Sequence, residues 1–467
     1  MKKLEKILQF NITYLFLIIF LIGYIFIFTV IIKHESKNMP STLIGTIVDV
    51  DINEEKISFI LNSNEKIKCV YYLNKFDKTD YSTLLGKKVK IKGKKNELTD
   101  NTIPNTFNYK KYLYNNKIYL SLIVDKIEII KKENIFYKFK NDIIKRINNQ
   151  HKTIKTYLNL LILGDKSYLS DDIYNHYQTN GIWHLFAISG MHISLIILIL
   201  DLILKKIRFK KIIICIFLLY FLFLTNYSAS VLRITIFYFL KSIFLYKNIQ
   251  LRNDQILMLT AAIILLFLPF TIYNVGFQYS FLISYAIMLE SKTLTGKYFI
   301  KIFKISFLSF IVSLPITINL NFEINLLSIF LNVIYVPFVT FIIFPLSIIS
   351  FLFPMFSNIL LFFINLLEYT NNLFYNFRFL VVLPKISAII FVSYYIILYI
   401  YYKTKKFIFL ISLFLLIFSN LVLTKLSKEY QVSFLDQTTP NMIQRISGIF
   451  ERNPLISKEI KPFLNFN

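Results

Sequence analysis

Residues 181–194 read GIWHLFAISGMHIS, and the apolar run LIILILDLIL follows directly. Together the two segments are long enough for a helix to cross a lipid bilayer, yet polar side chains stand at its start. Unpaired polar atoms cost several kcal/mol each in hydrocarbon, so these side chains need partners or water. The stretch therefore predicts a membrane helix that begins at a polar site. The residues of this site are His184, Ser189, Gly190 and His192.

The composition places the chain among integral membrane proteins. Hydrophobic residues make up 55% of its 467 positions, the mean hydropathy is +0.56, and apolar runs recur from residue 10 to about residue 421. The formal charge of +26 fits lysine-rich cytoplasmic loops and also attracts polyanions. Cys69 and Cys215 are the only cysteines, which excludes a disulfide framework and a cysteine zinc site.

Basic clusters predict the orientation of the chain. Three lysines precede the apolar run at residues 10–32, which is longer than a signal-peptide core and lacks a cleavage site. It is predicted to be a retained span that leaves the N-terminus in the cytoplasm. Counting later runs against the basic loops gives about eleven transmembrane helices and an extracytoplasmic C-terminus. These loops lie at residues 205–211, 247–252, 292–304 and 403–406.

The segment from residue 34 to residue 133 has a different pattern. Apolar and polar residues alternate in short stretches separated by polar turns, which predicts strands of a small β-barrel. The sequence LGKKV at residues 85–89, which leads into one such strand, resembles an oligonucleotide/oligosaccharide-binding (OB) fold. The predicted strands are residues 42–51, 56–61, 66–72 and 88–94, with a final pair at 117–124 and 126–131.

Several motifs resemble one known family. Residues 184–192, HLFAISGMH, are similar to the H-L-x-A-I-S-G-x-H signature of the ComEC family, the polytopic channel proteins of bacterial DNA uptake. Three further segments are similar to family elements, although Asn274 stands where aspartate is common. A fourth, around residues 103–113, departs from the family at Pro104 and Asn108. The three segments are SASVLR at 228–233, NVGFQYSF at 274–281 and NVIYVPFVTFIIFP at 332–345.

The resemblance implies a multi-pass channel of the bacterial plasma or inner membrane that passes single-stranded DNA during natural transformation. No catalytic residues, metal or cofactor are expected in this chain. A cytoplasmic helicase-type ATPase, an extracytoplasmic DNA receptor and membrane lipids are its implied partners; the sequence itself has no nucleotide-binding phosphate loop. Residues 430–436 resemble the opening strand of the family's metallo-β-lactamase-like domain, but its H-x-H-x-D-H motif does not follow. The nuclease domain is therefore expected to be missing.

The predicted fold class is a polytopic α-helical membrane protein with a small extracytoplasmic β-barrel domain that is OB-fold-like. Residues 134–163 carry apolar positions at helical spacing with lysines opposite, so an amphipathic helix is expected at the membrane surface. The predicted domains are an N-terminal transmembrane helix at 1–33, the OB-fold-like domain at 34–133, an amphipathic helix and connector at 134–180, the transmembrane channel domain at 181–425 and an extracytoplasmic tail at 426–467.

The predicted DNA path joins the signature to charged groups in later spans. Charges inside a membrane usually face a bundle interior or a water-filled cavity. Arg233 and Lys241 therefore either contact phosphate, pair with Asp201 or Glu290, or extend to the membrane surface. The predicted path residues are His184, Ser189, Gly190, His192, Arg233, Lys241 and Gln278.

Other functions of the signature stay open. The two histidines are eight positions apart, unlike the i, i+4 pair of a zinc helix, and no acidic third ligand is near, so no metal site is expected. A membrane-bound hydrolase acting through Ser189 lacks a G-x-S-x-G elbow. A secondary transporter of a small anionic solute would also use intramembrane cations. A purely structural role of the motif is the remaining alternative.

The barrel is expected to guide the DNA strand. Positive charge and stacking aromatic rings hold single strands without reading their sequence. The alternative is that the aromatic rings fill the barrel core. The predicted DNA-guiding residues are Tyr71, Tyr72, Lys88, Lys90 and Lys92.

Overall fold

The computed structural model divides the chain into two compact units, residues 1–313 with 325–379 and residues 314–324 with 380–467. Predictions for residues 1–20, for the segment around Pro104 and for the tail beyond residue 438 fall outside the part that is described. The structure describes residues 21–31, 42–52, 56–73, 84–100, 108–291, 293–377 and 379–438.

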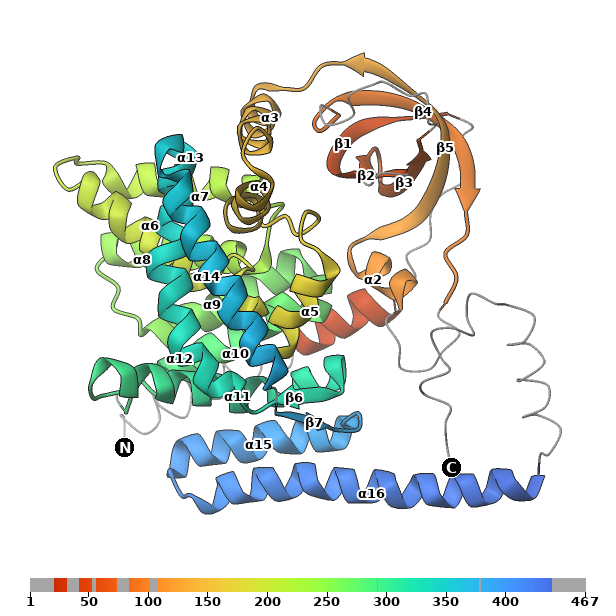
Figure 1. The fold of residues 1–467 in the computed structure, drawn as a ribbon, viewed down its shortest axis with the longest axis vertical. Coiled ribbons are helices and arrows are strands. Elements are labelled where there is room, and N and C mark those ends of the chain that lie inside the picture. The colour runs from red at the N-terminus through yellow and green to blue at the C-terminus, as the bar shows by residue number, and fades with distance from the viewer. Residues whose placement is uncertain are drawn as a thin grey trace. The chain divides into compact units, whose positions relative to one another are not determined.

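The first strands form a closed β-barrel, coloured red to orange in Figure 1. Neighbouring strands follow the order β1-β2-β3-β5-β4, and β4 also pairs with β1. The β3–β5 pair is parallel and the other four pairs are antiparallel. The small barrel expected from the alternating pattern is thus present. Its strands are β1 (Thr42–Ile52), β2 (Lys56–Asn62), β3 (Lys66–Tyr72), β4 (Lys88–Asn96) and β5 (Ile118–Lys131).

The final pair of strands expected at residues 117–131 is wrong, because β5 is one continuous strand of 14 residues. Its first half pairs with β3, and from Ser121 onward it pairs with β4, so Asp125 lies within the strand and not in a turn. The register of β4 shifts between Lys92 and Gly93. A Cβ at Gly93 would collide with the carbonyl of Ile123, so glycine permits this bulge and the bend that closes the barrel.

The amphipathic segment is also divided differently from the prediction. Residues 134–163 form α3 (Ile135–Asn148), α4 (Lys152–Leu158) and the π-helical turn η3 (Asn159–Leu163). His151 has extended backbone, with φ −53° and ψ 144°, and interrupts the helix. On α3, Lys140 is buried, whereas Ile135 and Phe136 are exposed. The expected helix is thus divided, and Lys140 is an exception to the lysines expected opposite the apolar positions, since it has a polar partner inside.

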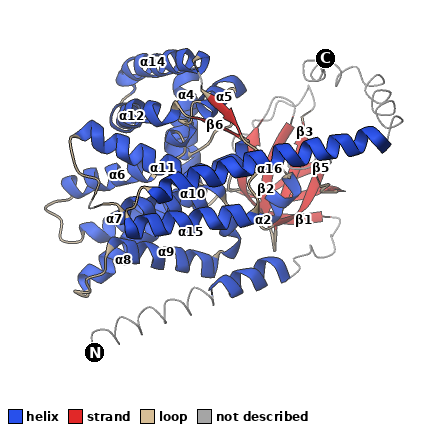
Figure 2. Cartoon of the chain, turned by 90° about the horizontal axis from the view of Figure 1, so that it is seen from below, coloured by secondary structure: helices blue, strands red, loops and turns tan. Residues whose placement is uncertain are grey.

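Most of the other described residues are helical, as the blue ribbons of Figure 2 show. After α2 (Tyr109–Asn115) and the connector come α5 (Asp171–Thr179), η4 (Trp183–Leu185), α6 (Gly190–Ile203), α7 (Lys210–Leu224), α8 (Ala229–Tyr246), α9 (Asn253–Phe267), η5 (Pro269–Tyr273), α10 (Val275–Leu289), α11 (Tyr298–Asn321), α12 (Ser328–Phe338), η6 (Val339–Ile343), α13 (Phe344–Leu352), η7 (Pro354–Phe356) and α14 (Ser357–Asn376). Before the barrel lies the π-helical turn η1 (Ile27–Ile31).

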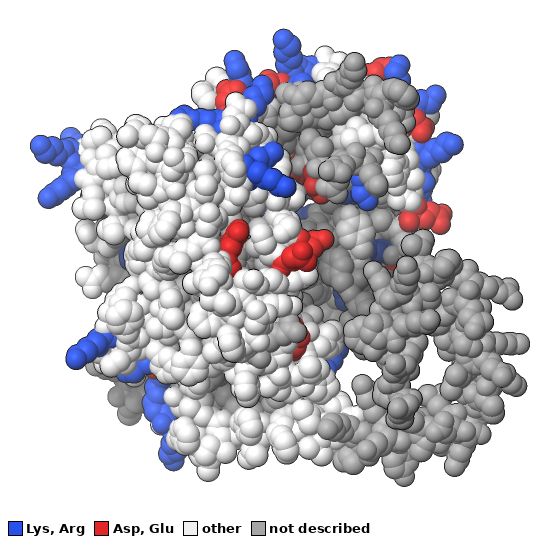
Figure 3. Space-filling view, viewed as in Figure 1, with Lys and Arg blue, Asp and Glu red and all other residues white. Residues whose placement is uncertain are grey.

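Four helical stretches within the described residues are long and apolar enough to cross a membrane. Further apolar helices of 10–17 residues accompany them. The face over the helices in Figure 3 is mostly uncharged, with lysine and arginine side chains mainly at its margins and a few acidic side chains near its middle. Large uncharged areas are expected of a surface in contact with lipid. A polytopic helical protein with a small β domain is thus confirmed, while the number eleven stays a prediction. The four stretches are Trp183–Ile203, Ala229–Tyr246, Tyr298–Asn321 and Ser328–Leu352.

The second unit contains α15 (Ala388–Thr404) and α16 (Ile408–Thr438), which lie side by side in both Figure 1 and Figure 2. The short strand β7 (Leu380–Val382) pairs with β6 (Glu323–Asn325). Residues 430–436 are helical, so the opening strand expected there is wrong. No glycine or proline interrupts the sequence from residue 408 until Pro440, and the helix therefore continues past its apolar part.

Candidate functional site

The signature serine and its second histidine build the start of α6. Ser189 is the N-cap residue, and its Oγ accepts a hydrogen bond of 3.4 Å from the backbone N–H of His192. In return the N–H of Ser189 donates to Nδ1 of His192, also at 3.4 Å. This reciprocal capping box satisfies donors that the first turn of a helix leaves free. Ser189 and His192, two polar residues of the motif, thus stabilise the start of the helix.

His192 is fully buried, and its ring stacks on Phe344 with the centroids 4.4 Å apart. Because Nδ1 accepts a hydrogen bond, the proton of the neutral ring is on Nε2, which has no hydrogen-bond partner within the described part of the chain. His184 differs: its side chain is exposed, and its Nδ1 lies 3.0 Å from the carbonyl oxygen of Gly181. The two histidines therefore occupy different environments, one inside the bundle and one on its surface.

Arg233 lies against the first turn of α6. It is only 8% exposed, and its Nε donates to Oγ of Ser280 on α10 at 2.8 Å. Its guanidinium lies over the ring of Phe281, 5.9 Å from the centroid. A Cβ added to Gly190 would lie 2.8 Å from Nη2 of Arg233, so glycine is what allows this close approach. Three segments far apart in the chain, those containing Gly190, Arg233 and Ser280, thus meet at one place.

No carboxylate balances the charge of Arg233 among the described residues. The two acids considered from the sequence are engaged elsewhere: Asp201 forms an ion pair of 2.8 Å with Lys210, and Glu290 accepts from the hydroxyl of Thr293. The positive end of the α6 dipole lies beside Arg233 and adds to its field. A buried cation next to a helix N-terminus is an environment that favours an anion.

The other two path residues do not join this group. Nε2 of Gln278 donates to the carbonyl of Ile272 at 2.8 Å, which ties the start of α10 to the turn before it. Asn274, the residue in place of the family's aspartate, caps the same helix by accepting from the N–H of Phe277 at 3.0 Å. Lys241 is half-buried on α8, two turns after Arg233.

On the barrel, the predicted guiding residues separate into two kinds. Lys88, Lys90 and Lys92 point outward from β4, whereas the residues between them, Val89 and Ile91, fill the core. Tyr72 is 57% exposed, but Tyr71 packs against the barrel core. The strand therefore presents a row of three lysines, and only one of the two tyrosines is available to stack on a base.

A buried lysine that the sequence analysis missed joins the barrel to the helices. Lys140 of α3 is 4% exposed, and its Nζ donates to Oδ1 of Asn226 at 2.6 Å and to the carbonyl of Phe223 at 3.3 Å. Nδ2 of Asn226 in turn donates to Asp49 of β1 at 3.2 Å. Burial lowers the pKa of Lys140 to about 8 despite the nearby carboxylate, and burial likewise raises the pKa of Asp49. The spacing of Lys140 in the sequence could have revealed its burial, since residues 140, 144 and 147 share one helix face.

A second polar cluster, also missed, lies between α4, α5 and α14. The hydroxyls of Tyr157 and Tyr177 are hydrogen-bonded to each other, and Tyr157 donates to Oε1 of Glu368 at 2.8 Å. Nearby, Nδ2 of Asn180 donates to Oδ1 of Asn371 at 2.7 Å. Within the described part of the chain, no group of three or more histidine, cysteine, aspartate or glutamate side chains is arranged to hold a metal ion.

Comparison with known proteins identifies the family to which the chain belongs. The family model described as competence protein matches residues 161–407, which is more than half of the chain. The chain belongs to the competence protein family. The match includes the signature, Arg233 and Ser280, and it confirms the ComEC resemblance that the motifs carried.

Curated proteins similar to this competence protein come from Bacillus and Mycoplasma. ComE operon protein 3 of Bacillus subtilis (strain 168) is 26% identical over 358 residues, or 70% of this chain and 45% of the relative. The uncharacterized protein MG316 of Mycoplasma genitalium is 29% identical over 189 residues, and its homologue in Mycoplasma pneumoniae 31% over 186. Each of these two alignments covers 40% of this chain, with 49% and 48% of the relatives. The chain spans less than half the length of each relative. No solved structure matches the chain.

Proposed function

We propose that this competence protein forms a membrane channel that passes single-stranded DNA across the cytoplasmic membrane during natural transformation. The observation that carries the proposal is Arg233, a buried cation held beside Gly190 at the start of α6, with no carboxylate partner among the residues that the structure describes. Burying an uncompensated charge is costly, and such groups in membrane proteins mark ion and substrate pathways. A DNA phosphate that passes this site is the anion that fits the environment.

The remaining path residues contribute to the proposed site in different ways, some directly and some through their neighbours. Ser189 and His192 hold the helix start in place, beside which Arg233 approaches Gly190. His184 is exposed near the same helix end, and Lys241 supplies a second cation two turns further along α8. Gln278 acts indirectly, by fixing the start of the helix that carries Ser280.

The hydrolase alternative loses its main support, because the nucleophile and base are not arranged for catalysis. The ring nitrogen of His192 that faces Ser189 accepts from the backbone N–H and not from the hydroxyl. In a serine hydrolase the base must accept the proton of the nucleophilic hydroxyl. A transporter of a small anionic solute is the second candidate, since a buried arginine serves either anion.

The barrel would receive the strand before it reaches the membrane. A closed barrel with strand order β1-β2-β3-β5-β4 is the arrangement expected of an OB-like domain, a class that holds single strands in basic grooves with aromatic platforms. Lys88, Lys90 and Lys92 supply the charge, and Tyr72 supplies an exposed ring. Phosphate contacts of this kind weaken steeply with salt.

The proposed topology has about eleven spans, a cytoplasmic N-terminus and an extracytoplasmic C-terminus, with a helicase-type ATPase inside and a DNA receptor outside. Maleimide labelling of cysteines placed at Asn62 and Asn467 tests it, because both should react from outside the cell. Of the native cysteines, Cys69 is buried and its pKa is raised to about 12, so it will not react. Cys215 is replaced by alanine for this experiment.

Substitution of Arg233 tests the channel itself. In cells that carry the gene as its only copy, we expect Arg233→Leu to lower uptake of labelled DNA by at least about 30-fold, with Arg233→Lys intermediate. Arg252→Leu is the matched control, because Arg252 is exposed and forms an ion pair with its neighbour Asp254. Normal uptake with Arg233→Leu at wild-type protein level would contradict the channel, and normal uptake after gene deletion would favour the small-anion transporter.

A further inference from the structure

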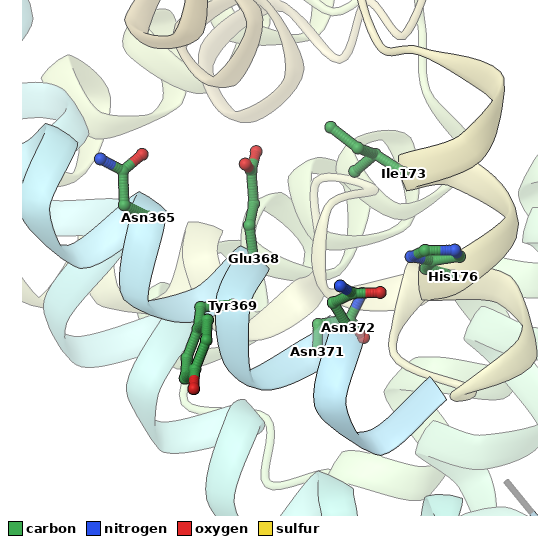
Figure 4. A pocket seen from close by; sticks show the side chains of 7 residues that line it. All are labelled: Ile173, His176, Asn365, Glu368, Tyr369, Asn371 and Asn372. Carbon is green, nitrogen blue, oxygen red and sulfur yellow. The ribbon is translucent and has the colours of Figure 1, made fainter. Parts of the chain in front are cut away.

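A cavity of about 380 Å³ lies between α5 and α14, and its lining includes none of the residues assigned to the DNA path. Its volume falls within the range of about 300–1,000 Å³ that is usual for small-molecule sites. The side chains in Figure 4 come from two helices, and those of Asn365 and Glu368 rise from α14 toward the same side. The lining residues are Ile173, His176, Asn365, Glu368, Tyr369, Asn371 and Asn372.

Buried hydrogen bonds hold the wall of this cavity in place. Tyr157 fixes one oxygen of Glu368, and Asn180 fixes Asn371; both of these supporting side chains are almost fully buried. The ring of His176 stacks on Tyr375, with the centroids 3.9 Å apart and the planes inclined by 25°. A lining whose rotamers are fixed by partners behind it is preorganised for a ligand in front of it.

The chemistry of the lining suits a nucleobase better than a phosphate. It combines three amides, one carboxylate and one imidazole, and no lysine or arginine is among the lining residues that the structure describes. Asn365, Glu368 and Asn372 are spaced by three and four positions, so they follow one another along one face of α14. Amides pair with base edges, and a carboxylate accepts from the amino group of cytosine. The same carboxylate repels a phosphate.

We propose that this cavity binds an unpaired nucleobase of the DNA strand and favours bases that carry an exocyclic amino group. The inference rests on the proposed channel function, because it assigns the base contacts that complement the phosphate contact at Arg233. Unstacked bases of single strands are commonly held by side-chain hydrogen bonds on their edges together with an aromatic or imidazole ring. Glu368 and the amides would supply the hydrogen bonds, and His176 the ring.

The test uses the full chain in lipid nanodiscs and two oligonucleotides of equal length, oligo(dC) and an abasic strand with the same phosphates. We expect the wild-type protein to bind oligo(dC) about tenfold more tightly than the abasic strand. The double variant Asn365→Ala/Asn372→Ala should reduce this preference to about twofold while leaving the affinity for the abasic strand unchanged. Both asparagines are exposed, so the exchange leaves the supporting hydrogen bonds intact.

Asn358→Ala is the matched control, since Asn358 is an exposed asparagine of the same helix outside the cavity. It should keep the wild-type preference. An unchanged preference in the double variant, or an equal loss of affinity for both strands, would overturn the base site. A change of oligomeric mass in the double variant would overturn it in favour of contact with a second copy of the chain. Absence of binding to either strand would contradict the channel proposal and this inference with it.

Discussion

The barrel and the helical part both carry basic side chains, but they hold them in opposite environments. On β4 three lysines stand in water, separated by residues of the barrel core, and any one of them can be screened by salt. Arg233 is a single cation, almost fully buried, bonded to Ser280 and packed against Gly190. The difference teaches that the charges of the barrel act additively and over a distance, whereas the one in the helices depends on close packing.

The largest effect is expected from a substitution that disturbs the packing around Arg233 and leaves every charge in place. We expect Gly190→Leu to reduce transformation to the level of a gene deletion, because even a Cβ would lie 2.8 Å from the guanidinium of Arg233. Gly23→Leu is the control, since nothing lies within 4 Å of a Cβ at that position. Transformation frequency and protein level in the membrane are measured together. Wild-type frequency with Gly190→Leu would mean that the contact with Arg233 is not needed.

A smaller effect is expected when Arg233 keeps its position but loses its partner. Ser280→Ala leaves Nε of a buried guanidinium without an acceptor, which costs about 1–3 kcal/mol, so uptake should fall about tenfold. Uptake of labelled DNA by intact cells is the measurement. Ser412→Ala serves as the control, because the hydroxyl of Ser412 donates to the carbonyl of Phe409 in its own helix. Equal effects of both substitutions would show that Ser280 does not position the arginine.

The barrel side of the comparison predicts a change in salt dependence. Replacing Lys88, Lys90 and Lys92 by glutamine should make the negative slope of log affinity for single-stranded DNA against log salt less steep by about 2, since each phosphate contact contributes about −0.7. Binding of the purified full chain is measured by titration at several salt concentrations. The same exchange at the exposed residues Lys205, Lys206 and Lys211 is the control. Equal slopes for the two triple variants would contradict a guiding role of β4.

The smallest effect concerns Lys140. It is buried like Arg233, but its ammonium group donates hydrogen bonds to Asn226 and to the carbonyl of Phe223, which is a structural role. Its folded pKa of about 8 lies below the unfolded value of about 10.4, so the unfolded chain binds more protons between these values. Stability should therefore rise with pH in this window, by at most about 1.4 kcal/mol per pH unit. Thermal unfolding in detergent at pH 8, 9 and 10 measures this rise.

Two variants isolate the contribution of Lys140. Lys140→Met removes the titrating group and should flatten the rise relative to the wild type. Lys138→Met, at an exposed lysine of the same helix, should follow the wild type. Parallel curves for all three proteins would show that the lysine keeps an ordinary pKa in the folded chain.

The strands could be predicted because their pattern is local. Val89 and Ile91 alternate with lysines, and the structure buries the former and exposes the latter. The prediction failed at Asp125, where a polar residue in the middle of β5 looked like a turn. Asp125 is the extra residue of a bulge opposite Lys92 and Gly93 of β4, where a side chain at position 93 would collide with β5, and the sequence of β5 alone does not reveal that.

For the site, the sequence identified the residues but not their contacts. The motif marked Ser189, Gly190 and His192, and Arg233 was singled out as a charge within a span. Its partner Ser280 is 47 positions away, and Asn180 and Asn371 are 191 positions apart. Helical periodicity shows which residues share a face, but not which faces meet. Asn180, Asn371 and the polar residues of α14 therefore passed unnoticed among many asparagines.

The closed ring of strands also restricts how other proteins can attach to this domain. Because β4 pairs with both β1 and β5, the ring is closed, and backbone lacks a strand partner where a strand extends past its neighbour, as β5 does beyond the residues that pair with β3. Addition of an extended peptide as a further strand, a common route for one protein to recruit another, is therefore confined to such short stretches. In the proposed function, a receptor that delivers DNA to this barrel would rely mainly on side-chain contacts, so surface substitutions should weaken its binding.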